Sequence, residues 1–455
     1  MNYTDLKHFI FQHQIQVMKP ITKIFSTLLA VVLFCGCEKD EAPALFTNAF
    51  EKELVLQGFD TDGNGKISKQ EAEAVTYLNI SGKSLPDITG IELFINLDSL
   101  LCSTNELSKL NISKNKALTY LDCSNNKLST LDVSGNSLLT WMSCNNNQLS
   151  RLDVSNHTLL KTLLCTVNQI SELDLNNTAL QTLGCYFNNL TTLNLTGLTA
   201  LTVVSCERNH LTNLDISGNS ALELLFCSWN DLSGIDVSGN AALKELECSG
   251  NQITSLGISA NRALEGLVCN NNKLTLIDVS KNRALTYLEC NNNMFSNLDL
   301  SGNILLTWLK CNNNNLASLD VSNSTGLSHL ECDFNQLTSI DLSMVPDLLV
   351  LQCSGNKLAG LDVSKNPKMI VLDCAGNNLT SIDVSNNTGL LDFSCRANNL
   401  ASLNLSNNKS LQSLSIENMP SLYKVCFWEM SLPPTNIRIL TIGSPNYYYS
   451  TDCSL

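Results

Sequence analysis

The chain has 455 residues, a net charge of −14 and an isoelectric point near 4.8. This acidic balance, together with a sequence that has no long basic run, excludes nucleic acid and an anionic membrane surface as expected partners. Nineteen cysteines would suggest a secreted disulfide scaffold, but fifteen of them fall into one regular repeat.

The first 37 residues have the pattern of a signal peptide. Two lysines precede an apolar run over residues 24–34, which is too short to span a membrane as a helix. Translation is expected to start at Met18. Residues 33–37 (LFCGC) resemble a lipobox, which predicts lipid attachment at Cys37. The alternative is ordinary signal-peptide cleavage nearby.

The four residues after the lipobox cysteine are Glu38-Lys39-Asp40-Glu41. A lysine followed by two acids at this place resembles the signal that directs lipoproteins of Bacteroidota to the cell exterior. We therefore expect an outer-membrane protein that is lipid-anchored and faces the exterior. Its only contact with the membrane would be the lipid.

Residues 38–77 are predicted to form a helical N-terminal cap around a calcium loop, with helices over 45–58 and 68–77. Residues 60–71 (DTDGNGKISKQE) match the EF-hand loop at every position. Its predicted oxygen ligands are the side chains of Asp60, Asp62, Asn64, Ser68 and Glu71 and the main-chain carbonyl of Lys66. Because no ligand is missing, we expect a structural Ca²⁺. The alternative is a degenerate cap that keeps the fold without the ion.

Residues 78–418 repeat the 21-residue pattern L-x-x-L-x-C-x-x-N-x-L-x-x-L-D-V-S-x-N. The cysteine recurs every 21 residues, with one step of 20, at Cys102, Cys123, Cys144, Cys165, Cys185, Cys206, Cys227, Cys248, Cys269, Cys290, Cys311, Cys332, Cys353, Cys374 and Cys395. A fixed period of this length, with leucines and an asparagine in phase, is the signature of a leucine-rich-repeat solenoid.

Within one repeat, Leu121 and Cys123 are two residues apart and therefore point to the same side of a strand. Stacked copies predict a parallel sheet on the inner face of an arc, with the leucines and cysteines buried behind it. The asparagine after each cysteine, such as Asn126, is expected to hydrogen-bond backbone groups of the turn. The L-D-V-S half, with Leu131 and Val133, predicts a second buried row along the outer face.

The ladder cysteines admit three interpretations. In-register parallel strands are about 4.8 Å apart, whereas a disulfide needs Cβ atoms about 3.8 Å apart and turned toward each other. Zinc is disfavoured because a single file of sulfurs cannot surround one ion tetrahedrally. We therefore expect fifteen reduced thiols that act as small apolar fillers.

On these residues the chain resembles the internalin J-like, cysteine-ladder leucine-rich-repeat proteins, and also the leucine-rich-repeat lipoproteins of Bacteroidota. The resemblance covers residues 78–419. It implies a surface-displayed adhesin or ligand-binding role. It also implies an EF-hand-like cap at the N-terminal end of the repeats, as in internalins.

Residues 419–455 lose the repeat pattern and are predicted to form a small C-terminal cap. Cys426 and Cys453 lie outside the ladder, in a chain whose signal peptide leads to a compartment that permits disulfides. They could pair or remain free.

No repeat brings a nucleophile, a base and an orienting group together, so we expect no enzyme. His157 and His210 are expected near repeat turns, away from any partner. Glu245 and Glu247 have the spacing of paired carboxylates, but solvated charges on an exposed strand are the favoured interpretation.

The inner-face positions vary between copies. Tyr287, Trp308 and His329 have the same phase on consecutive strands. The charged residues beside them are Glu289, Lys310, Glu331 and Asp333. A second aromatic group consists of Trp141, Tyr186, Phe187, Phe226 and Trp229.

Exposed aromatic residues flanked by charge are typical of interaction surfaces, although scattered surface aromatics are also common. We expect a binding module for a protein or other macromolecular ligand at these inner-face residues. The alternative is a glycan-capturing lipoprotein for nutrient uptake, in which Trp and Tyr would stack on sugar rings.

Overall fold

The computed structural model describes residues 46–176, 178–428, 433–434 and 437–453. The predicted signal peptide over residues 1–37, and Cys37 with it, lie outside the described residues. In the part of the chain that is described, no helix is both long enough and apolar enough to cross a membrane. Residues 45–455 form one unit by themselves.

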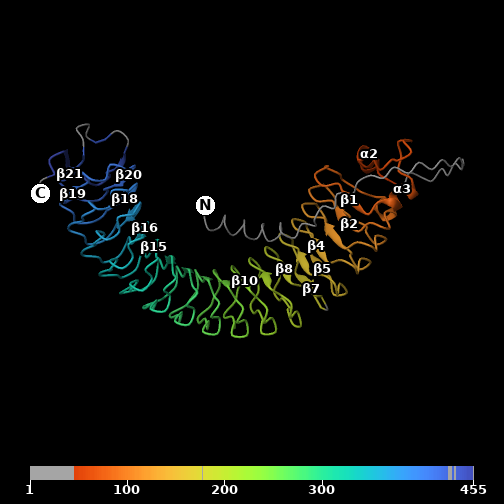
Figure 1. Ribbon diagram of the computed structural model, residues 1–455, viewed down its shortest axis with the longest axis horizontal. Coiled ribbons are helices and arrows are strands. Elements are labelled where there is room, and N and C mark those ends of the chain that lie inside the picture. Colours follow the sequence, from red (N-terminus) through yellow and green to blue (C-terminus); the bar gives the residue numbers. More distant parts are fainter. Residues whose placement is uncertain (1–45, 177, 429–432, 435–436, 454–455) are drawn as a thin grey trace. The chain divides into compact units, whose positions relative to one another are not determined.

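Two short helices begin this unit (Figure 1). Helix α2 spans Asn48–Leu56 and α3 spans Lys69–Ala74. Both are shorter than predicted. The second helix ends before Tyr77, because Tyr77 already begins the first strand, β1 (Tyr77–Asn79).

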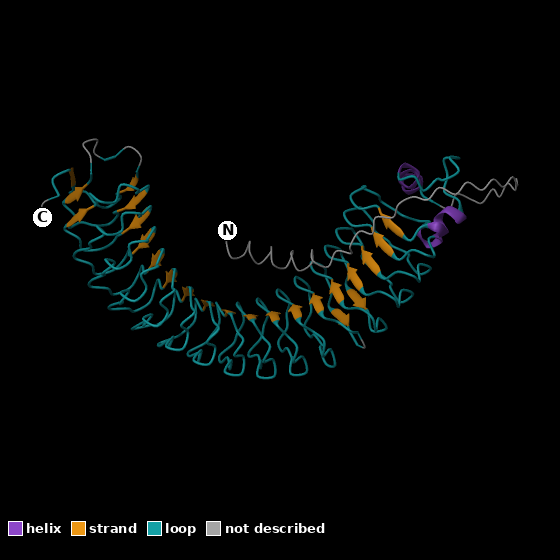
Figure 2. Ribbon diagram, viewed as in Figure 1, coloured by secondary structure: helices purple, strands orange, loops and turns teal. Residues whose placement is uncertain are grey.

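The repeats form a parallel main sheet in which each three-residue strand pairs in register with the next copy, as Leu121 does with Leu100 and with Met142. In spatial order its eighteen strands are β1, β2 (Ser99–Leu101), β3 (Tyr120–Asp122), β4 (Trp141–Ser143), β6 (Thr162–Leu164), β8 (Thr182–Gly184), β9 (Val203–Ser205), β10 (Leu224–Phe226), β11 (Glu245–Glu247), β12 (Gly266–Val268), β13 (Tyr287–Glu289), β14 (Trp308–Lys310), β15 (His329–Glu331), β16 (Val350–Gln352), β17 (Val371–Asp373), β18 (Asp392–Ser394), β20 (Ser413–Ser415) and β22 (Arg438–Leu440). Figure 2 shows these strands on the concave side of the curved solenoid. The predicted inner sheet is thus confirmed.

Three smaller elements complete the fold. A 3₁₀ turn, η1, spans Ile91–Leu93. A two-stranded sheet pairs β5 (Arg151–Asp153) with β7 (Glu172–Asp174). A three-stranded sheet joins β19 (Ser402–Asn404), β21 (Lys424–Cys426) and β23 (Tyr448–Ser450).

The core consists of the predicted rows. Leu121 and Cys123 have no exposed surface, and Val133 of the outer row is also buried. All fifteen ladder cysteines are unpaired and buried, as predicted. Burial raises the pKa of these thiols, to about 12 for Cys165, so they remain protonated and uncharged at neutral pH.

The asparagine three residues after each cysteine hydrogen-bonds backbone groups of the turn, as expected. Asn126 Nδ2 donates to the carbonyls of Cys102 and Cys123 at 3.0 and 3.1 Å, and its Oδ1 accepts from Leu107 N at 3.0 Å. One side chain therefore connects two successive coils and closes the turn after the strand.

A second asparagine row, on the outer half of the repeat, was not predicted. Asn136 is fully buried, and its Nδ2 donates to the carbonyls of Ile112 and Asn115 at 3.0 and 2.9 Å. His157 takes the place of this asparagine one copy later, with Nε2 3.0 Å from Val133 O. The expectation that His157 has no partner is wrong, because its ring bonds the same carbonyl row.

The C-terminal residues add more parallel strands beyond the predicted end of the repeats at residue 418. Strand β22 pairs with β20, and β23 pairs with β21. Cys426 and Cys453 are joined as a disulfide with Cα atoms 5.5 Å apart. The neighbouring ring of Phe427 packs against Trp428 and Tyr449.

Candidate functional site

The predicted inner-face rings lie on three adjacent strands and contact one another. The Trp308 and His329 rings stack at 3.9 Å between centroids and 18° between planes, and Tyr287 lies 6.1 Å from Trp308. We call these three residues the ring ledge. Strand register alone brings them together, because Tyr287 pairs with Trp308 and Trp308 with His329.

The charges beside the ring ledge form a closed network. Lys310 Nζ lies 3.0 Å from Glu331 and 3.7 Å from Glu289, and also 5.2 Å from the centre of the Trp308 ring. The cation is therefore balanced by two carboxylates and held over an aromatic face. Among the described residues, Trp308 Nε1 has no hydrogen-bond acceptor.

Two titratable groups at the ring ledge have shifted pKa values. Burial lowers the pKa of His329, with Lys310 acting in the same direction and Glu331 against it. Burial raises the pKa of Asp333 to about 6, although its carboxylate accepts a hydrogen bond from Ser354 N. Asp333 therefore changes charge near pH 6, whereas His329 does so below the ordinary histidine pKa of about 6.5.

The predicted ring residues differ in exposure, and the expectation that their rings are exposed is wrong for Tyr287 and Phe226, which are buried. Tyr287 is 7% exposed and Phe226 is 8% exposed, whereas Trp229 is 49% exposed. Phe226 ends β10, and Trp229 lies in the turn that follows it. The structure thus brings Tyr287, Trp308, His329 and Glu289 together and leaves Phe226 and Trp229 on a separate strand and turn.

That turn belongs to a row with left-handed backbone, two residues after each ladder cysteine. Positive φ values there occur at Thr104, Asn125, Asn146, Val167, Phe187, Arg208, Trp229, Gly250, Asn271, Asn292, Asn313, Phe334, Gly355, Gly376 and Ala397. Asparagine and glycine adopt this conformation at little cost, and they fill eight of these positions. Their prevalence two places after the cysteine was a sequence signal that could have revealed the row.

Three consecutive members of the row form a cluster that sequence reasoning found only in part. The Arg208 guanidinium lies 5.2 Å from the Phe187 ring centre and 5.7 Å from that of Trp229. We call Phe187, Arg208 and Trp229 the turn cluster. Arg208 was missed because the sequence of one repeat does not show that side chains from three successive coils contact one another.

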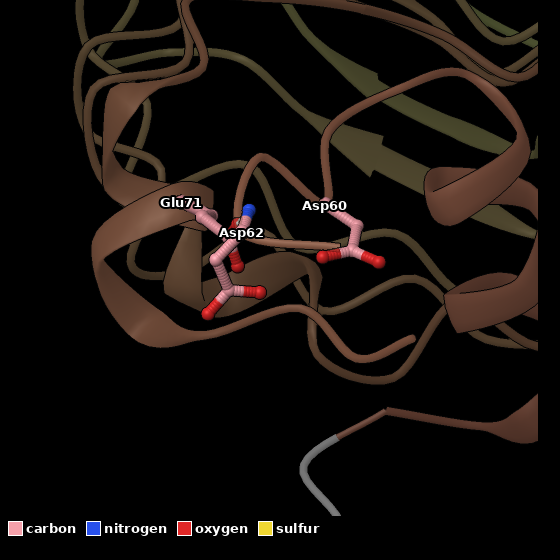
Figure 3. Close-up of side chains that lie close together, drawn as sticks. All are labelled: Asp60, Asp62 and Glu71. Carbon is pink, nitrogen blue, oxygen red and sulfur yellow. Dashed lines mark hydrogen bonds between the residues drawn. The ribbon is translucent and has the colours of Figure 1, made fainter. Parts of the chain in front are cut away.

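The predicted calcium loop connects α2 to α3. Asp60, Asp62 and Glu71 carry carboxylate oxygens that lie within 4.8 Å of one another (Figure 3). Asp60 accepts hydrogen bonds from Asn64 N and Gly65 N, and Asn64 Oδ1 accepts from Lys66 N at 2.8 Å. These backbone bonds curl the loop so that its oxygens converge.

Glu71 has a second role, because it forms a capping box with Ser68, the N-cap residue of α3. Its carboxylate accepts hydrogen bonds from Ser68 N and from the Thr61 hydroxyl, at 2.9 and 2.8 Å. Burial opposes its charge, but these hydrogen bonds outweigh burial and lower the pKa of Glu71 to about 2. The residue is therefore ionised at neutral pH, which suits a hard cation with oxygen ligands.

Solved structures with similar folds include three informative cases. The functional domain of internalin J from Listeria monocytogenes, which includes a cysteine ladder, is 29% identical, with a TM-score of 0.58 over 86% of this chain and 79% of that one. A leucine-rich-repeat protein of Leptospira interrogans is 21% identical, with a TM-score of 0.65 over 82% and 97%. The plant peptide hormone receptor RGFR1, solved in complex with RGF2, is 17% identical, with a TM-score of 0.54 over 79% and 80%.

No protein-family model and no curated protein matches the chain. The structural similarity and the geometry together define a leucine-rich-repeat solenoid. Within that class the protein is similar to internalin J, whose functional domain includes a cysteine ladder, and its own fifteen ladder cysteines are buried.

Proposed function

We propose that the protein is a binding module that recognises a protein partner on the concave face of its solenoid. The ring ledge carries this proposal. Its rings are stacked on adjacent strands before any ligand arrives, and rigid aromatic groups offer contact area at little entropic cost.

Similar proteins support a protein partner over other ligands. The plant receptor that shares the fold was solved with its peptide hormone ligand. A leucine-rich-repeat arc also gives such proteins an extended concave surface for macromolecules.

The test is binding of the purified protein to parallel arrays of extracellular proteins and of glycans. We expect saturable binding to a protein that Trp308→Ala with His329→Ala weakens by about 2 kcal/mol or more, with no change in circular dichroism. Binding to glycans alone would instead favour a lipoprotein that captures glycans for nutrient uptake.

We also propose that the protein is a lipoprotein of the outer membrane, anchored through Cys37 and facing the cell exterior. The lipobox-like sequence and the acidic residues after it support this placement. Cys37→Ser should abolish incorporation of a labelled fatty acid and release the protein from the membrane fraction. Unchanged fractionation and labelling would overturn the proposal.

A structural Ca²⁺ between α2 and α3 is our third proposal. Three converging carboxylates and the Asn64 oxygen match the hard oxygen ligands that calcium takes, and an ion would relieve their mutual repulsion. Calcium should raise the melting temperature, and chelation should lower it. Asp60→Ala with Glu71→Ala should remove both effects; an unchanged response to calcium would exclude this site.

A further inference from the structure

We infer that the turn cluster is a docking surface for a protein segment that presents a carboxylate flanked by apolar side chains. The inference deepens the proposed function, because it assigns a second contact region and the chemistry of its partner. It rests on the backbone conformation, the ring contacts and the charge of Phe187, Arg208 and Trp229.

The backbone of the turn cluster is strained. Phe187, Arg208 and Trp229 have φ of +57°, +54° and +59°. This left-handed conformation costs a residue with an ordinary side chain about 1–2 kcal/mol, which the asparagine or glycine of other copies largely avoids. Strained residues that gather in consecutive copies point to a function beyond the fold.

The turn cluster is also pre-formed and exposed. Phe187 and Trp229 are 50% and 49% exposed, and the Arg208 guanidinium lies between their rings. On the other side of the Trp229 ring is Gly250 of the following coil, where a Cβ atom would lie 2.5 Å from the ring. Trp229 is thus bracketed by Arg208 and Gly250, and its outer edge faces solvent.

The charge of the turn cluster selects an acidic group. Among the described residues, no carboxylate forms an ion pair with Arg208, and the adjacent Glu207 carboxylate accepts from the Ser205 hydroxyl instead. The N–H groups in the plane of a guanidinium can bind a carboxylate in a bidentate manner. Arg208, which has no ion-pair partner among the described residues, is therefore complementary to a partner carboxylate.

The same geometry favours protein over sugar. Stacking on a sugar requires an open ring face, whereas Gly250 lies against the Trp229 ring and Arg208 Cζ lies 5.7 Å from the ring centre. The exposed ring edges suit apolar side chains on either side of the acid. Because the whole molecule is acidic, a carboxylate without such apolar contacts would be repelled.

The test is selection of random short peptides, displayed on phage, against the purified protein. We expect enriched peptides to carry Asp or Glu next to apolar residues, and Arg208→Asn to weaken their binding by about tenfold or more. Asparagine is already the residue of many copies at this turn, so this variant should fold normally with an unchanged or higher melting temperature. Phe334→Asn, at the same turn position in a copy without a neighbouring arginine, is the matched control and should bind as the wild type does.

Three outcomes would overturn the inference. Enriched peptides that bind Arg208→Asn as well as the wild type would exclude the turn cluster. Enrichment of basic peptides, or binding of acidic oligosaccharides alone, would exclude the proposed partner. If Trp308→Ala with His329→Ala abolishes peptide binding while Arg208→Asn leaves it intact, this inference fails but the proposed function at the ring ledge stands.

Discussion

The ring ledge and the turn cluster use the same chemistry, a cation against aromatic rings, in two different backbone settings. The ring ledge lies on β13 to β15, where extended backbone accepts Tyr, Trp and His without strain. The turn cluster lies where φ is positive, so each of its side chains carries a conformational cost.

The cations of the two regions also differ in their ion pairs. Lys310 at the ring ledge is neutralised by Glu289 and Glu331, whereas Arg208 has no ion-pair partner among the described residues. A satisfied cation on unstrained strands adds to folding stability. A cation on strained turns that has no ion pair among the described residues is better explained by a partner that binds later.

The largest expected effect tests whether the Trp229 ring lies over Gly250. Gly250→Ala should cost about 3 kcal/mol, from left-handed strain of about 1–2 kcal/mol and crowding of the ring by about 1–3 kcal/mol. Gly376→Ala is the matched control, because Gly376 has a similar φ of +60° but its Cβ would meet no atom closer than 3.5 Å. Urea denaturation of both variants measures the difference.

A double-mutant cycle completes this test. In the Trp229→Asn background, Gly250→Ala should cost only as much as Gly376→Ala does, since the ring is gone. Equal costs for the two glycine variants in the wild-type background would mean that the ring does not occupy this position.

Removal of one tryptophan from each region should have unequal effects on stability. Trp308→Ala should cost about 2 kcal/mol, because the ring loses buried area, its stacking on His329 and its contact with Lys310. Trp229→Asn should change stability by less than about 1 kcal/mol, because relief of strain offsets the lost contacts. Denaturation midpoints measure both, and equal losses would contradict the contrast between the two regions.

The sequence was sufficient for the ring ledge but not for the turn cluster. A 21-residue period places residues of the same phase on adjacent strands, so Tyr287, Trp308 and His329 had to be neighbours once the sheet was predicted. The arginine stack of the turn cluster depends on how side chains of three coils lean, and no period determines that.

The buried polar rows show a similar limit. Asn126 was predicted to close its turn because it stands where a strand ends. His157 was misjudged because a histidine can bond the carbonyls that an asparagine bonds in other copies. Only the shared position in the repeat, and not the residue type, indicates this equivalence.

Asp333, which lies beside the ring ledge, offers a test with a smaller expected effect on stability. Its folded pKa of about 6 is raised above the unfolded value, so the stability it contributes is present below about pH 4 and is lost as pH rises through 6. Asp333→Asn should therefore stabilise the protein by about 1–2 kcal/mol at about pH 8, after allowance for solvent screening, and have little effect at about pH 4.

The substitution keeps the hydrogen bond, because Asn312 accepts from Asp333 N in the preceding copy as Asp333 accepts from Ser354 N. Thermal melts at the two pH values measure the effect. A gain that is equal at both would assign it to packing rather than to the carboxylate charge.

The smallest expected effect concerns His329, and it separates the two regions by their response to pH. The folded pKa of His329 is lowered, so its contribution to stability is present above the unfolded value of about 6.5 and is lost as pH falls through the folded value. Protonation of His329 adds a positive charge close to Lys310, which is unfavourable. The attraction between the charged ring and the Trp308 ring offsets part of this cost, so the loss of stability should stay below about 1 kcal/mol.

The measurement uses the Asp333→Asn background, because titration of Asp333 changes stability in the opposite direction to titration of His329. His329→Gln should abolish the remaining pH dependence between about pH 5 and 7, and NMR should locate the titrating ring by its missing signal in that variant. Because a guanidinium does not titrate in this range, Arg208→Asn should change stability equally at both ends. A pH-dependent effect of Arg208→Asn would mean that the turn cluster contains a titrating partner, and its cation would no longer be unpaired.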